Sequence, residues 1–490
     1  MTLVLLAALV AVLEGGIPSP AAASEALVKG RLNEFVASKA DTSQRFSIYI
    51  PTGYDPSRPA PILYLMDPRG RARVAAKLFQ PAAERFGYIL VSSHNTASDV
   101  AADGNLRAMQ AMWLDSHDWF AIDDRRVYVA GFSGTARLAT LMARHLPKSI
   151  TGIIGSAAAY HPDVRPSREA AFLYFGTVGD ADYNFHEMER LEAQLVSANV
   201  PHRISRFAGA HSWMPPDRAM EALEWFELKA MQAGTRPRDA ALIDAWWQRD
   251  EEAVRTRLAG GRDLDAARRL SAMARDFYGL RDVADVRSEG SRVAATDGAR
   301  QETRRRQASA TASDQWKGQA MNLISAAYAE GADAAAHPAA DLVRMLDLDR
   351  LKRTATGGDE AALEARRRLA ELEVQLGFYL PAVAMESGEQ ARASYYLGIA
   401  LQINDRNPVP WYLLARASAR LNDIDDTFKA LERAFDSGFR DLTLTEGDPA
   451  FARVQSRAEF SAFVARLRAS GDTLDLLTVD RPPPANLPLR

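Results

Sequence analysis

The sequence predicts an α/β domain with a mostly parallel sheet, followed by an all-helical region. Between about residues 30 and 234, short apolar segments with strand composition alternate with helical segments. Such near-continuous apolar strands, separated by helices, indicate a sheet that helices cover on both faces. After Pro237 no convincing strand segment follows. A third observation is Gly131-Phe132-Ser133-Gly134, where small residues stand between a β-prone run and a helix-forming run.

The elements of the first region follow from its apolar pattern. The predicted strands cover residues 46–50, 62–66, 88–92, 127–130, 151–155, 172–175 and 204–207. The predicted helices cover residues 74–86, 106–113, 136–145, 185–196 and 219–231. Helices separate several of these strands, as a parallel sheet requires, and the helix at 219–231 closes the domain.

The second half of the chain is rich in Ala, Leu, Arg and Glu at helical spacing. Residues 281–315 are so polar that a solvated helix, a loop and a disordered segment are all compatible with them. Residues 360–378 predict a long amphipathic helix. Two sets of buried-type residues recur at an offset of 34 positions: Ala393, Leu397 and Ala400, then Thr427, Leu431 and Ala434. This offset is that of tetratricopeptide repeats, and a generic helical hairpin is the alternative.

Composition excludes several classes of site and partner. The 490 residues carry a formal net charge of −3, with no basic field that would favour nucleic acid. The absence of cysteine excludes disulfides, thiolate metal sites and a cysteine nucleophile. An apolar run over residues 3–13, followed by small residues at 21–24, predicts an export signal and a secreted or periplasmic location. The run is too short to span a bilayer, so we expect no membrane association after cleavage.

The turn at Ser133 has the composition of a nucleophile elbow. Small neighbours let the backbone bend sharply and lift the serine hydroxyl above the sheet. The start of the next helix supplies an N–H group for a developing oxyanion, and Gly134 is the predicted donor. Arg69 is the predicted second donor, because Pro68 in the same loop has no N–H. The alternative for Ser133 is a cap of the following helix.

A general base and an acid that orients it are needed beside such a serine. His211 follows the strand at 204–207 and is the predicted base. Asp180 and Asp182 both follow the strand that ends at residue 175, and either could hold the imidazole while the other caps the next helix.

Two aromatic residues near these positions, Tyr183 and Trp213, are candidates for substrate binding. The alternative for both is core packing, since large aromatic side chains are mostly buried.

At these residues the chain resembles the α/β-hydrolase superfamily. The closest resemblance is to the branch of feruloyl esterases, acetylxylan esterases and polyhydroxybutyrate-depolymerase-like proteins. Three motifs carry it: Tyr49–Asp55, Ile122–Gly134 and Gly209–Trp213. The resemblance spans about residues 45–226. It implies a three-layer α/β-hydrolase sandwich and ester hydrolysis without a cofactor.

The same resemblance implies Ser133 as nucleophile, His211 as base and Asp182 or Asp180 as acid. The chain departs from the family pattern at two places. Thr135 replaces the last glycine of the usual elbow, and Asp67-Pro68-Arg69 replaces the usual His-Gly pair of the oxyanion loop.

Two functional hypotheses follow. The first is an exported serine esterase that acts through an acyl-enzyme on a small-molecule or polymer-borne ester. The second is an inactive hydrolase-like scaffold that binds a protein partner through its helical C-terminal half. The expected segments are a signal peptide (1–24), a catalytic domain (30–234), a helical region (238–385), repeat-like helices (386–470) and a tail (471–490).

Overall fold

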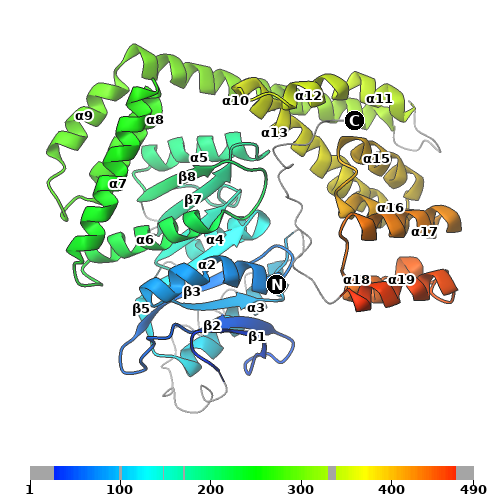
Figure 1. Cartoon of the computed structure of the whole chain (residues 1–490), viewed down its shortest axis with the longest axis horizontal. Coiled ribbons are helices and arrows are strands. Elements are labelled where there is room, and N and C mark those ends of the chain that lie inside the picture. The colour runs from blue at the N-terminus through cyan, green and yellow to red at the C-terminus, as the bar shows by residue number, and fades with distance from the viewer. Residues whose placement is uncertain (1–26, 99–101, 147, 169–171, 329–337, 471–490) are drawn as a thin grey trace. The chain divides into compact units, whose positions relative to one another are not determined.

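An eight-stranded sheet organises the first part of the chain in the computed structural model, which describes residues 27–98, 102–146, 148–168, 172–328 and 338–470. The strands are β1 (Leu32–Ala37), β2 (Arg45–Tyr49), β3 (Ala60–Met66), β4 (Ile89–Ser93), β5 (Ile122–Phe132), β6 (Gly152–Ser156), β7 (Leu173–Gly179) and β8 (His202–Phe207). Their order in the sheet is β1-β2-β4-β3-β5-β6-β7-β8 (Figure 1). The β1–β2 and β2–β4 pairs are antiparallel, and β4 to β8 form a continuous parallel sheet with β3. The predicted α/β class with a mostly parallel sheet is confirmed.

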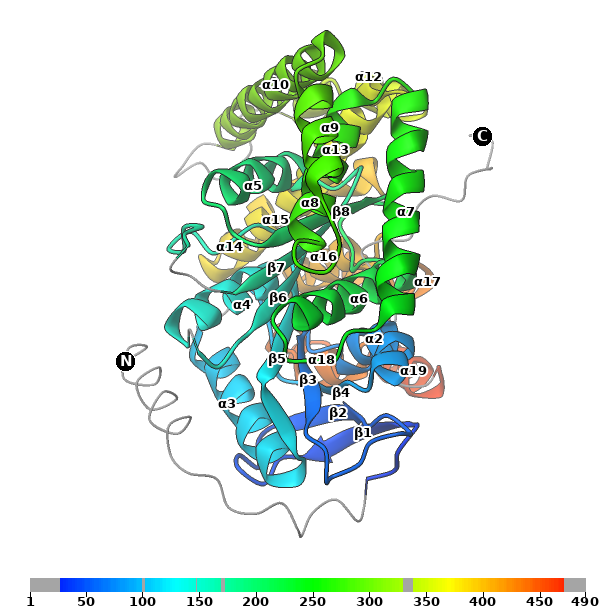
Figure 2. The same ribbon diagram turned by 90° about the vertical axis from the view of Figure 1, so that its left-hand side faces the viewer.

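Helices cover both faces of this sheet, as the apolar strands require. Figure 2 shows α2 (Ala72–Phe86) and α6 (Pro216–Gln232) on one side and α3 (Ala102–Trp119) and α4 (Gly134–His145) on the other. The connection from β7 to β8 contains α5 (Phe185–Ser197). The seven predicted strands and five predicted helices of this region are all present.

The strand β1 was not predicted, because its sequence Leu-Asn-Glu-Phe-Val-Ala lacks a continuous apolar run. It is an edge strand, paired on one side only, and most of its residues are partly or fully exposed. A strand of this kind is stabilised by its ladder with β2 and has little apolar signal of its own.

The described chain divides into two compact units. The first contains residues up to 179, 186–207 and 213–309, and the second contains 180–185, 208–212 and the residues from 310 onward. Three more helices belong to the first unit: α7 (Ala240–Ala259), α8 (Asp263–Asp276) and α9 (Ala284–Ala294). Their side chains share one hydrophobic core with the sheet, in which Phe226, Trp246 and Met273 are almost fully buried. The first unit therefore extends beyond the domain boundary that we predicted near residue 234.

The second unit is helical throughout its C-terminal part. The polar segment that begins at residue 281 forms α9 and much of α10 (Asp297–Ala327), so the helical alternative was the correct one. The remaining helices are α11 (Ala339–Met345), α12 (Leu348–Ala355), α13 (Glu360–Val374), α14 (Leu380–Glu386), α15 (Gln390–Ile403), α16 (Pro408–Arg420), α17 (Ile424–Asp436), α18 (Leu442–Gly447) and α19 (Ala458–Ala469). A π-helical turn over Gln375–Tyr379 joins α13 to α14.

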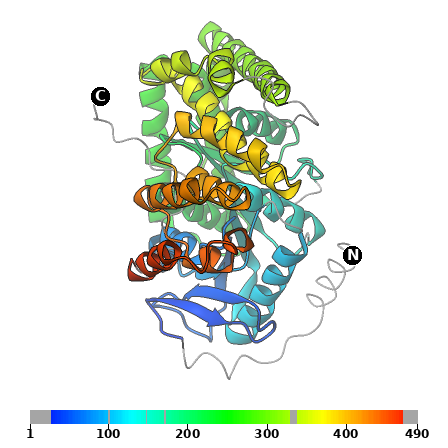
Figure 3. The same cartoon turned by 90° about the vertical axis from the view of Figure 1, so that its right-hand side faces the viewer.

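The helices α15, α16 and α17 lie side by side in chain order (Figure 3). The six residues of the predicted repeat pattern are fully buried: Ala393, Leu397, Ala400, Thr427, Leu431 and Ala434. Burial of this face fits helices packed in succession, and membership in the tetratricopeptide family stays a prediction.

Two sequence expectations fall at the ends of the chain. The predicted signal peptide at 1–24 and the tail at 471–490 lie outside the described residues. Within the part that the structure describes, no helix combines the length and the apolar character needed to cross a bilayer.

Candidate active site

Ser133 lies at a sharp turn between β5 and α4. Its backbone has φ 53° and ψ −125°, a conformation that residues with a side chain rarely adopt. The Ser133 N–H donates to the carbonyl oxygen of Ser156 at 2.9 Å, and the Ser133 carbonyl accepts from Ala136 at 3.0 Å and Arg137 at 3.3 Å. A strained serine between a strand and a helix is the geometry of a nucleophile elbow.

The glycines beside Ser133 allow the strand, turn and helix to approach closely. A Cβ atom on Gly131 would lie 2.5 Å from the backbone carbonyl group of Thr135. A Cβ atom on Gly134 would lie 2.4 Å from the Cβ of Ser98. Both distances are far below van der Waals contact, so the turn requires glycine at these two positions.

Thr135, which departs from the family pattern, has a structural role in the elbow. Its hydroxyl donates to the carbonyl oxygen of Met66 at 2.7 Å and lies 2.8 Å from that of Phe132. The Thr135 hydroxyl oxygen also accepts the N–H of Phe132 at 3.1 Å. The threonine thus fits without a clash and joins the end of β3 to the turn.

The two predicted oxyanion donors have different surroundings. Gly134 begins α4, and the first N–H groups of a helix have no acceptor within the helix. The Arg69 N–H donates to the Asp67 carboxylate at 2.8 Å. A role for Arg69 as second donor therefore requires that this hydrogen bond be exchanged for one to the substrate.

Asp67 is completely buried in the same loop as Arg69, and its carboxylate binds several neighbouring groups. The sequence analysis did not assign it a role. Its carboxylate accepts from Nε and Nη2 of Arg71 at 2.9 and 3.0 Å, and from Nε1 of Trp213 at 2.8 Å. Burial alone would raise the pKa of Asp67, but the charge and hydrogen bonds of Arg71 outweigh it and lower the pKa. The Trp213 ring packs against Phe79 and Phe132, so this predicted substrate contact also supports the loop.

The two candidate acids have different hydrogen-bond partners. His211 Nδ1 lies 3.0 and 3.1 Å from the two carboxylate oxygens of Asp182, which is completely buried. A carboxylate can only accept, so Nδ1 carries the hydrogen and Nε2 is the basic nitrogen of the neutral ring. The Asp180 carboxylate accepts the Gly209 N–H at 3.1 Å.

Both aspartates also accept a backbone N–H group. Asp182 itself accepts the N–H of Asn184 at 2.7 Å just before α5, in addition to binding His211. Asp180 instead joins the two loops 180–185 and 208–212, and the Ala181 N–H reinforces this link by donating to the Gly209 carbonyl at 2.9 Å.

Tyr183 lies directly on the predicted base. Its ring stacks on the His211 imidazole with a centroid distance of 4.2 Å and an interplanar angle of 28°. This stack restricts rotation of the imidazole.

Arg367 on α13 is a second residue that the sequence analysis missed. Its Nε donates to the backbone carbonyl of Asp180 at 2.7 Å, and its guanidinium lies 3.9 Å from the ring centroid of Phe185. Glu360 and Glu364 pair with its Nη1 at 2.8 and 3.3 Å, and the side chain is only 3% exposed. The contact joins positions 187 residues apart, and no local pattern indicates it.

Each of the three candidate segments follows directly after a strand of the sheet: Ser133 after β5, residues 180–185 after β7 and residues 208–212 after β8. β5, β6, β7 and β8 are consecutive parallel strands, and the pairs Phe132↔Ser156, Ser156↔Thr177 and Gly179↔Phe207 lie near their carboxyl ends. Ser133, the Asp182 loop and the His211 loop therefore all begin where these strands end.

No family model and no curated protein matches the chain. Among solved structures, it is similar to the S-formylglutathione hydrolase FrmB from Staphylococcus aureus at 11% identity, over 41% of this chain and 98% of that one, with a TM-score of 0.34. A ferulic acid esterase matches at 14% identity over 39% and 93% of the two chains, with a TM-score of 0.33. The esterase Est22 matches at 13% identity over 40% and 80%, with a TM-score of 0.32.

Proposed function

We propose that this protein is a serine hydrolase that cleaves carboxylic esters, with Ser133 as nucleophile, His211 as base and Asp182 as orienting acid. The observation that carries the proposal is the strained elbow at Ser133, on the sheet edge from which the hydrogen-bonded Asp182 and His211 loops depart. A buried acid on Nδ1 of a histidine is the arrangement that prepares Nε2 to take a proton.

In the proposed reaction the Ser133 hydroxyl oxygen attacks the ester carbonyl carbon while His211 Nε2 takes the hydroxyl proton. The Gly134 N–H stabilises the negative oxygen of the tetrahedral intermediate. The intermediate collapses to an acyl-enzyme, and the alcohol leaves with the proton from His211. Water, deprotonated by His211, then attacks the acyl carbon and releases the acid, which restores the serine.

The proposed substrate is a small-molecule or polymer-borne ester, and the proposed site of action is the periplasm or the exterior, after export. The resemblance of the segments Ile122–Gly134 and Gly209–Trp213 to feruloyl and acetylxylan esterases supports an ester over a peptide. The competing hypothesis is the inactive scaffold with a protein partner on the helical half. An activated serine is what distinguishes the two.

Labelling with a fluorophosphonate probe tests the proposal without assuming a substrate. We expect one adduct, which peptide mapping assigns to Ser133, and no adduct in Ser133→Ala or His211→Ala. Ser149→Ala, which changes a serine beyond the far end of α4, is the matched control and should label like wild type. Absence of an adduct on folded wild-type protein would contradict the hydrolase proposal and favour the scaffold.

Replacing Arg367 should reduce esterase turnover, because the acid loop would lose its hydrogen bond at the Asp180 carbonyl and its cover over Phe185. We expect Arg367→Ala to lower kcat by about 10- to 100-fold with a smaller change in KM, since small misplacements of catalytic groups cost this much. Arg366→Ala is the matched control, because Arg366 on the same helix bonds to Ala355 instead. Equal kcat values for both variants would show that Arg367 does not position the loop.

A further inference from the structure

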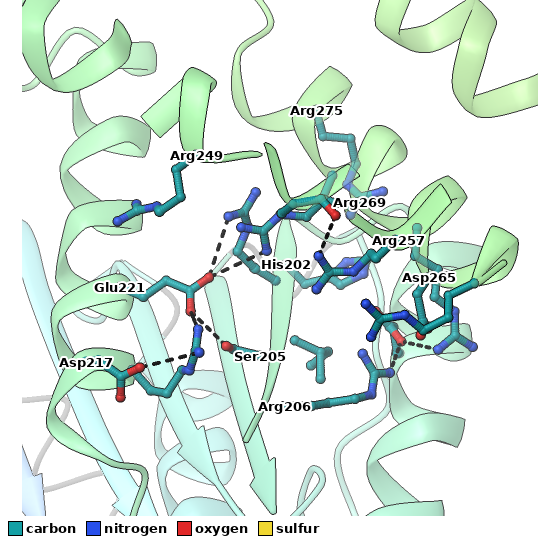
Figure 4. Close-up of a pocket in the computed structure, with 18 residues that line it drawn as sticks. His202, Ser205, Arg206, Asp217, Glu221, Arg249, Arg257, Asp265, Arg269 and Arg275 are labelled. Atoms are coloured by element: carbon teal, nitrogen blue, oxygen red, sulfur yellow. Dashed lines mark hydrogen bonds and ion pairs between the residues drawn. The ribbon is translucent and has the colours of Figure 1, made fainter. Parts of the chain in front are cut away.

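A cavity of about 690 Å³ lies in the first unit between the edge strand β8 and the helices α5 to α8 (Figure 4). Nine arginines line it: Arg203, Arg206, Arg218, Arg249, Arg257, Arg262, Arg268, Arg269 and Arg275. Four carboxylates also line it: Glu192, Asp217, Glu221 and Asp265. We call this cavity the arginine pocket. None of the residues that line it belongs to the proposed ester-cleaving site.

Carboxylates outside the lining only partly balance these cations. Four of them pair with arginines of the pocket: Glu189, Glu224, Asp250 and Asp276. Three of the four also bind a further cation, which is Arg306 for Glu189, Arg85 for Glu224 and Lys229 for Asp276. Positive charge therefore remains in excess around the cavity.

Several guanidinium donors of the pocket lack a protein acceptor. Arg203 Nη1 and the Nε atoms of Arg218, Arg269 and Arg275 are buried without a hydrogen-bond partner among the described residues, although Arg203 Nη1 lies 3.7 Å from Glu221. Arg257 donates to the Ala253 carbonyl at 2.8 Å rather than to a carboxylate. Buried donors of this kind are costly when unsatisfied, and an anion in the cavity would offset the positive charge of the same guanidinium groups.

Repulsion between these cations contributes to their pKa shifts. Burial lowers the pKa of the Arg257, Arg269 and Arg275 guanidinium groups, and neighbouring arginines lower it further, although nearby carboxylates act in the opposite direction. The neighbouring cations include Arg262 for Arg257, and Arg203 for the other two. A bound anion would oppose this repulsion.

We propose that the arginine pocket binds a compact anion with two or more phosphate groups. Guanidinium forks match phosphate oxygens in pairs, and arginines from a strand and three helices surround the cavity, so that one phosphate cannot reach them all. The volume lies within the range of ordinary small-molecule sites. The lining contains no Phe, Tyr or Trp; its one imidazole is that of His202, and its apolar members are only Ile204, Ala253 and Ala272. The pocket therefore recognises the phosphate groups rather than a ring or an apolar tail.

Isothermal titration of the full chain with inorganic tripolyphosphate tests this proposal at constant ionic strength. We expect saturable binding at one site per chain and a binding constant at least tenfold weaker in Arg257→Ala/Arg275→Ala. Arg255→Ala is the matched control, since Arg255 lies on the same helix but is 72% exposed and pairs with Glu252 outside the pocket. This control should bind like wild type. Retained ester hydrolysis and far-ultraviolet dichroism verify folding of each variant, and Arg262→Ala replaces the double variant if the latter does not fold.

Two comparison ligands define what is recognised. Tripolyphosphate should bind at least tenfold more tightly than orthophosphate, and ATP should bind if the phosphate chain is the recognised group of a nucleotide. Binding of tripolyphosphate without ATP supports an inorganic or otherwise compact ligand. Absence of saturable binding, equal affinity for orthophosphate, or an equal loss in Arg255→Ala would overturn the proposal.

Discussion

The Asp182→Asn variant should hydrolyse an ester about 10⁴-fold more slowly than wild type, with little change in KM. The Asp182 carboxylate is fully buried and holds the Nδ1–H of His211 at 3.0 and 3.1 Å. An asparagine amide can present its NH₂ group to Nδ1 and so stabilise the wrong tautomer, with the hydrogen on Nε2. Nε2 would then be unable to accept the proton of Ser133. Steady-state kinetics on a p-nitrophenyl ester measures the loss.

Asp180→Asn is the control for this experiment, because it changes an identical side chain two positions away. Its carboxylate contacts the Gly209 N–H, and an asparagine carbonyl oxygen can accept the same hydrogen bond. We expect kcat to fall by less than about tenfold in this variant, the cost of a modest loss of positioning. Similar losses in both variants would mean that Asp182 has no special role toward His211.

The second large effect is on stability. Arg203→Ala should lower the free energy of unfolding by about 3–5 kcal/mol, the usual cost of breaking a buried ion pair from one side. The Arg203 side chain is 2% exposed, and its Nη2 lies 2.7 Å from Asp250 on α7 and 3.1 Å from Asp276 on α8. Both carboxylates are almost completely buried. Without Arg203 they lose the cation that joins these two helices to β8.

Urea denaturation of Arg203→Ala and Arg249→Ala measures this effect. Arg249 also faces the arginine pocket, but its side chain is 47% exposed, so its pair with Glu224 should contribute at most about 1 kcal/mol. If Arg203→Ala lowers the free energy of unfolding by less than about 1 kcal/mol, Arg203 does not stabilise the junction of β8 with α7 and α8.

Low pH should weaken the ion pairs of Asp276 with Arg203 and Lys229. Burial opposes ionisation of Asp276, but Lys229 and Arg203 lower its pKa to about 2. The stability that Asp276 contributes is therefore complete above its unfolded pKa of about 4 and is lost as the pH falls toward 2.

Local sequence patterns predicted the parts of the fold that depend on neighbouring residues. The apolar runs of β3 to β8 and the glycines around Ser133 are signals that span only a few consecutive residues. Burial of a strand and a sharp turn each constrain the residue types at adjacent positions. The edge strand β1 was not predicted, since its stability comes from pairing with β2. The inclusion of α7–α9 in the first unit also escaped, because it depends on which apolar faces meet.

Local patterns in the sequence were thus enough to predict the α/β class, the turn at Ser133 and the helical second half. The contact of Asp182 with His211, the hydrogen bond of Arg367 to the Asp180 carbonyl and the nine arginines around one cavity could be seen only in the folded chain. The cause is the long separation of these residues along the chain. Helix, strand and turn signals arise from adjacent side chains, whereas hydrogen bonds and ion pairs between remote polar groups exist only once the packed elements have set their burial and separation.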